Sequence, residues 1–166
     1  MTQTTTQDVM CPLWRRLFAL LYDLVAVIAI VMVVGMICQL ATHGNLITTG
    51  ANVHIAWWYQ PLQALMVAAY FLVSWLRGGQ TLGMRPWRIR VTSNGGARLA
   101  PKQALLRLIV AALPLSLLAL APYSGPRTAL WAVAIGWCVW FAVALVDRHR
   151  RTLHDIVAGS EVRRIG

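Results

Sequence analysis

The chain has 166 residues, of which 58% are hydrophobic, and its formal net charge is +10. In a water-soluble domain of this length, charged residues would interrupt the apolar ones throughout, but here the apolar residues gather in long blocks. This pattern excludes an ordinary soluble domain and indicates an integral membrane protein. Anionic phospholipid headgroups explain the basic residues more simply than nucleic acid does, because the arginines flank the apolar blocks.

Four apolar runs are long enough, or nearly long enough, to cross a lipid bilayer as helices. They cover residues 17–40, 56–76, 105–121 and 129–146. The first run is too long for the apolar part of a cleaved signal peptide, so we expect it to stay in the membrane. The sequence therefore predicts an all-α membrane protein with four transmembrane helices.

The basic residues predict how these helices are oriented. All of them except Arg127 lie before the first run, between the second run and the first turn of the third, or after the fourth. Short loops rich in Lys and Arg remain in the cytoplasm, so we expect both termini and the middle loop to face inward. Residues 1–13 would form a cytoplasmic lead and residues 14–162 a single transmembrane domain, while residues 147–166 would form a basic cytoplasmic tail.

The connection between the second and third runs carries the clearest local signals. Gly78 and Gly79 are expected to end the second helix with a left-handed cap. Residues 87–92 alternate polar and apolar side chains, and the turn sequence of residues 93–96 follows them. This pattern predicts a short β-hairpin on the cytoplasmic surface. Further along, Pro114 predicts a kink in the third helix.

Asp23 lies inside the first apolar run, where an ionised side chain costs about 2.5–3.5 kcal/mol near the centre of a span. Arg16 is nearly two helical turns earlier, roughly 10 Å along the axis, and points away from Asp23. We therefore expect Asp23 to need a partner on another helix, a water-filled pocket or a proton. Arg107, one turn into the third helix, enters the same leaflet at a suitable depth.

Two interpretations of this buried charge remain open. The carboxylate could belong to an ion pair that only fixes the register of the helices. Alternatively, it could belong to a site that binds a cation, a proton or a headgroup, and without a cation beside it Asp23 could exchange a proton.

Three motifs in order along the chain resemble the RDD family of small bacterial membrane proteins, which is named for one arginine and two aspartates. The matching stretches are Arg16-x-x-Ala19-x-x-x-Asp23, Gly79-Gln-Thr81-Leu-Gly83-Met-Arg85 with Ile89-Arg-Val91, and Leu153-His-Asp155-Ile-Val-Ala-Gly159. The resemblance covers roughly residues 12–162. Met84 departs from the pattern, since a lysine is common there, whereas Arg107 corresponds to a basic residue often seen at the start of a later helix.

The resemblance implies a location in the bacterial inner membrane and a transport role for unidentified ligands. Together with the charge argument, it leads us to expect a ligand-binding or ion-pair cluster. Its members would be Arg16, Asp23, Arg107 and Asp155, with a loop motif of Thr81, Gly83 and Arg85. We further expect Asp155 to tie the C-terminal tail to this loop.

The sequence carries no nucleophile–base set, phosphate-binding loop, metal-ligand group or redox pair, so we expect neither an enzyme nor a cofactor. One remaining function is a transport-related protein, in which Asp23 handles a small ion or an anionic ligand with help from Arg16 and Arg107. Such a protein would be a homo-oligomer, since four spans enclose little space. The alternative is an accessory or regulatory subunit that docks on a larger membrane complex, for example a lipid exporter.

Overall fold

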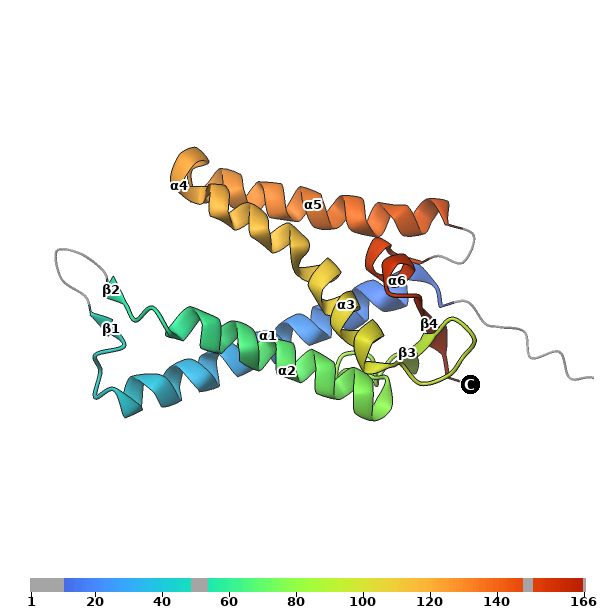
Figure 1. Cartoon of the computed structure of the whole chain (residues 1–166), viewed down its shortest axis with the longest axis horizontal. Coiled ribbons are helices and arrows are strands. Elements are labelled where there is room, and N and C mark those ends of the chain that lie inside the picture. Colours follow the sequence, from blue (N-terminus) through green and yellow to red (C-terminus); the bar gives the residue numbers. More distant parts are fainter. Residues whose placement is uncertain (1–10, 49–53, 148–150, 166) are drawn as a thin grey trace, which may run out of the picture.

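The computed structural model describes residues 11–48, 54–147 and 151–165, which form helices with two small sheets (Figure 1). The predicted cytoplasmic lead therefore lies mostly outside the described residues. The helices are α1 (Leu13–Ala41), α2 (Tyr59–Gly78), α3 (Pro101–Ala112), η1 (Leu113–Leu120), α4 (Ala121–Ser124), α5 (Pro126–Val146) and α6 (Leu153–Val157). The strands are β1 (Ile47–Thr48), β2 (His54–Ile55), β3 (Ile89–Ser93) and β4 (Ser160–Arg164).

Three helical segments in the described chain are long and apolar enough to cross a membrane: α1, the continuous segment Pro101–Ser124, and α5. Their outer surfaces are apolar and open, as a lipid environment requires, and Leu40 and Leu145 are 71% and 75% exposed. Helix α2 forms close to the predicted range, but Gln60, Pro61 and Gln63 make its first turns more polar. Three of the four predicted membrane helices are thus supported by length and composition.

The helices form two antiparallel pairs that meet at one end of the molecule (Figure 1). Helix α1 pairs with α2, and the η1–α4 segment pairs with α5. Near β3, β4 and α6 the pairs come together, because α3 packs against both α2 and α6. Toward the β1–β2 turn and α4 the pairs diverge in Figure 1.

Pro114 changes the winding of the third apolar segment at the point where the sequence predicts a kink. The α-helix ends at Ala112, and a 3-10 helix with Pro114 in its first turn follows. Proline has no N–H to give to the preceding helical turn, and its ring clashes with the carbonyl there. Helix α5 packs closely on this segment, since a Cβ atom at Gly136 would lie 3.2 Å from Pro114 Cβ.

The predicted β-hairpin is wrong in its partner strand. Strand β3 pairs antiparallel with the C-terminal strand β4, with Val91 opposite Val162. The turn at residues 93–96 does form, since the Gly96 N–H donates to the Ser93 carbonyl at 2.9 Å. Pro101 then begins α3 before the chain can continue as a second strand. The segment predicted as a basic tail therefore supplies α6 and a strand of this sheet.

Gly79 provides the predicted left-handed cap at the end of α2, with a φ angle of 68°. Its N–H donates to the Trp75 carbonyl at 2.9 Å, and its own carbonyl accepts from the Val91 N–H at 2.7 Å. A Cβ atom here would lie 2.7 Å from the Val91 carbonyl oxygen, so glycine permits the close approach. The cap thereby joins α2 to β3.

A small apolar core lies where the two helical pairs meet. Ile89, Val91 and Val162 from the β3–β4 sheet pack there with Ala19, Trp75 and Ala104 from the helices. Because this core joins α1, α2, α3 and the sheet, it fixes the positions of the charged residues around it.

Candidate functional site

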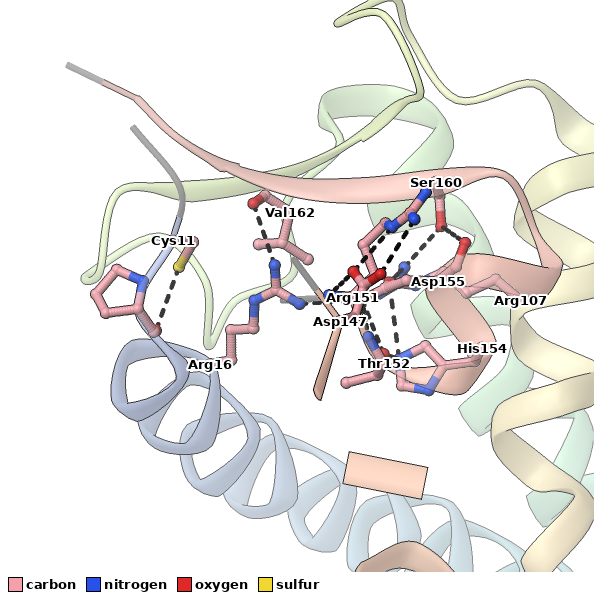
Figure 2. Close-up of polar contacts among 11 residues, drawn as sticks. Cys11, Arg16, Arg107, Asp147, Arg151, Thr152, His154, Asp155, Ser160 and Val162 are labelled. Carbon is pink, nitrogen blue, oxygen red and sulfur yellow. Dashed lines mark hydrogen bonds and ion pairs between the residues drawn. The ribbon is translucent and has the colours of Figure 1, made fainter. Parts of the chain in front are cut away.

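Asp155 is the centre of a buried ion triad that joins three separate parts of the chain (Figure 2). Its side chain is 1% exposed and lies in the first turn of α6. Arg16 of α1 donates from Nη1 to Asp155 Oδ2 at 3.0 Å, and Arg107 of α3 donates from Nη1 to Oδ1. Thr152 adds its backbone N–H at 3.1 Å and its hydroxyl at 2.8 Å, both to Oδ2.

The two arginines also hold strand β4. Arg16 Nη2 donates to the Val162 carbonyl at 3.3 Å, and Arg107 Nη1 donates to Ser160 Oγ at 2.9 Å. The Arg107 guanidinium lies 5.2 Å from the centre of the Trp75 ring, within range of a cation–π interaction. The triad therefore anchors the C-terminal segment to α1 and α3.

Asp155 is ionised and His154 is neutral at neutral pH. Burial alone would raise the pKa of Asp155, but the positive charges of Arg107 and Arg16 help to hold it at about 2. Burial and the charge of Arg107 lower the pKa of His154 to about 4. Since the Thr152 hydroxyl donates to Asp155, the neutral His154 ring donates from Nε2 to Thr152 Oγ1 at 2.9 Å.

Asp23, which is 2% exposed, is held by uncharged donors. Oδ1 accepts from the Tyr70 hydroxyl at 2.7 Å and from the Gly83 N–H at 2.9 Å. Oδ2 accepts from the Thr81 hydroxyl at 2.5 Å. No arginine within the described ranges forms an ion pair with Asp23.

The loop after α2 is tied by Asp23, so our prediction that Asp155 holds it is wrong. The reason is the packing of the helices: α2 packs against α1, and the loop that follows α2 bonds to Asp23 through Thr81 and Gly83. Gly83 makes the contact possible, because a Cβ atom there would overlap the Ala19 carbonyl and the Asp23 carboxyl group. Arg85 is exposed, and its side chain makes no hydrogen bond or ion pair with other described residues.

A cavity of about 40 Å³ lies between the triad and Asp23. Its lining includes all four residues of the predicted cluster, which are Arg16, Asp23, Arg107 and Asp155, together with Met84 and His154. The four charges cancel when both carboxylates are ionised. A space of this size accommodates a water molecule or a monatomic ion, but no larger ligand.

Sequence reasoning missed Tyr70 and Thr152. Tyr70 could have been predicted as a site residue, because its hydroxyl group lies in an apolar run and requires a hydrogen-bond partner there. The same hydroxyl accepts the Leu82 N–H at 3.1 Å, which links α2 to the loop. Thr152 precedes a short helix with an acidic residue three positions later, the pattern of an N-terminal cap.

Apolar helices with open lipid-type surfaces, joined at one end by a buried Arg–Asp–Arg triad, define a helical membrane protein with a buried ion cluster. The model of the RDD family matches residues 10–159, and the chain belongs to this family. The predicted membership is thereby confirmed. No curated protein and no solved structure matches the chain.

Proposed function

We propose that the chain is a four-span protein of the bacterial inner membrane, with both termini in the cytoplasm. Helix α1 and the start of α3 meet at the same end, because Arg16 and Arg107 both bind Asp155. If α1 crosses the membrane, the chain must cross back before α3 begins. Helix α2, antiparallel to α1, is the segment that can do so (Figure 1).

Labelling of single cysteines in a variant without the native ones tests this topology. Asn45→Cys lies in the connection between α1 and α2, and Arg88→Cys lies in the middle loop. A membrane-impermeant maleimide should label Asn45→Cys in intact cells and Arg88→Cys only after the membrane is opened. The opposite pattern, or equal labelling in intact cells, would refute the proposed orientation.

Within this protein, we infer that Asp23 takes up a proton or a small ion as part of a transport-related function. The observation that carries this proposal is a buried carboxylate that forms no ion pair with any described residue and lies on the wall of a cavity of about 40 Å³. Asp155 is unsuited to the same role, because two arginines occupy its oxygens and its pKa is about 2. The small volume favours a proton or monatomic ion over an organic anion.

A change in the charge of Asp23 would also reach the cytoplasmic loop. An ionised carboxylate accepts all three hydrogen bonds, from Tyr70, Thr81 and Gly83. A protonated carboxyl group becomes a donor at one oxygen and accepts less strongly at both. Uptake of a proton at Asp23 would therefore loosen the loop after α2 and open this end of the cavity.

Flux measurements in proteoliposomes test the role of Asp23. We expect wild-type protein to move protons or monovalent ions, and Asp23→Asn to abolish this flux while the protein stays folded. Asp147→Asn is the matched control, because Asp147 pairs with Arg151 and does not line the cavity. Unchanged flux in Asp23→Asn would refute the proposal. Absence of flux in the wild type, with co-purification of a larger membrane complex, would instead favour the accessory function.

A further inference from the structure

A second pocket, separate from the Asp23 cavity, lies between the end of α2, strand β3 and the segment that follows the turn. Its volume is about 100 Å³. Three arginines, Arg77, Arg90 and Arg98, contribute to its lining, and no acidic residue does. All three are exposed, and none forms an ion pair with another residue in the described part of the chain. The pocket therefore has a strong positive potential.

Two residues that line this pocket each carry a buried hydrogen-bond donor that lacks a partner within the described residues. The donors are Trp75 Nε1 and Thr92 Oγ1, whose residues are 6% and 2% exposed. A buried donor without a partner is energetically unfavourable, so a ligand that supplies an acceptor would be favoured here. Neither donor belongs to the ion triad, although the Trp75 ring stacks near Arg107.

We propose that this pocket binds the phosphate group of an anionic ligand. Guanidinium groups recognise phosphate through charge-assisted hydrogen bonds, and the free indole N–H and hydroxyl can donate to the same oxygens. The end of α2 contributes a partial negative charge of about half a unit, which three full positive charges outweigh. A phospholipid headgroup and a soluble phosphate share this chemistry.

Lipid binding by the full chain in detergent, followed by native mass spectrometry, tests the proposal. The probes are phosphatidylglycerol and a diacylglycerol with the same acyl chains, which lacks the phosphate group. We expect one phosphatidylglycerol to bind in preference to the diacylglycerol. Arg90→Gln and Arg98→Gln should each weaken its binding by about tenfold, the effect expected for one charge-assisted contact. Thr92→Val, which removes the hydroxyl without changing charge, should weaken it by about threefold.

Arg88→Gln is the matched control, because Arg88 is an exposed arginine beside β3 that does not line the pocket. Equal loss of binding in Arg88→Gln and Arg90→Gln, equal binding of the diacylglycerol, or no effect of Thr92→Val would overturn the proposal. If an arginine variant fails to fold, the effect of Thr92→Val on phosphatidylglycerol binding decides whether the proposal stands. Displacement of phosphatidylglycerol by inorganic phosphate at equal concentration would support the pocket with a soluble phosphate as its ligand; resistance to it would support a lipid headgroup.

Discussion

Replacing Asp155 by asparagine tests the energetic role of the ion triad. The substitution keeps the shape of the side chain but leaves the guanidinium groups of Arg16 and Arg107, only 6% and 4% exposed, without their counter-ion. The drop in the pKa of Asp155 from 3.8 to about 2 corresponds to about 2–3 kcal/mol of stability, present above pH 3.8 and lost as the pH falls toward 2. Leaving two buried charges unpaired raises the expected cost to about 3–5 kcal/mol.

Thermal unfolding of the purified protein in detergent measures this cost. For a chain of this size, we expect Asp155→Asn to lower Tm by roughly 8–15 °C, whereas Asp147→Asn, at a partly exposed ion pair, should lower it by only about 1–3 °C. Adding Arg107→Gln to Asp155→Asn should recover part of the loss, because it removes one unpaired charge. Equal shifts for the two aspartate variants would refute the reasoning.

Three further predictions concern the cavity and its surroundings. The pKa of His154 is about 4 in the folded protein and 6.5 in the unfolded chain, so the free energy of unfolding should fall by roughly 3 kcal/mol as the pH drops from 6.5 to 4. His154→Gln should flatten this dependence of Tm on pH. An unchanged profile would argue against a buried neutral imidazole. Thr81→Val removes the hydroxyl donor to Asp23 Oδ2 and should lower the free energy of unfolding by about 1–3 kcal/mol, whereas Thr81→Ser should lower it less. Equal stabilities of the two variants would contradict this contact. Met84→Lys brings an ammonium group to the cavity and should block flux in proteoliposomes, whereas Met84→Leu should not; equal flux in both would exclude a role for the charge of Asp23.

The sequence alone was sufficient to predict the apolar helices and to predict that Asp23 does not pair with Arg16. Helix geometry excludes a direct contact between these two residues, and in the structure each binds partners from other elements. The four charged residues of the predicted cluster do line one cavity, as expected for Arg16, Asp23 and Arg107 from their positions along the apolar runs. Their division into a triad and a separate carboxylate depends on how α6 packs, which no local pattern encodes.

The β3–β4 pairing is a second feature that local sequence patterns could not predict. The turn at residues 93–96 favours a partner strand nearby in the sequence, and that turn exists. The true partner, β4, comes from the far end of the chain and is positioned by Arg16 and Arg107 through Val162 and Ser160. Pairing over such a separation depends on tertiary contacts, so local alternation in either strand could not reveal it.

The central proposal is that the two buried carboxyl groups differ: Asp155 would be a fixed anion, and Asp23 would be the group that takes up a proton or ion. A hydrophobic carbodiimide reacts with carboxyl groups that accept a proton in apolar surroundings, and peptide mass spectrometry identifies the modified residue. We predict modification of Asp23 in membranes, with Asp155 left unmodified because Arg16 and Arg107 keep it ionised. Modification of Asp155 with Asp23 untouched would contradict the claim.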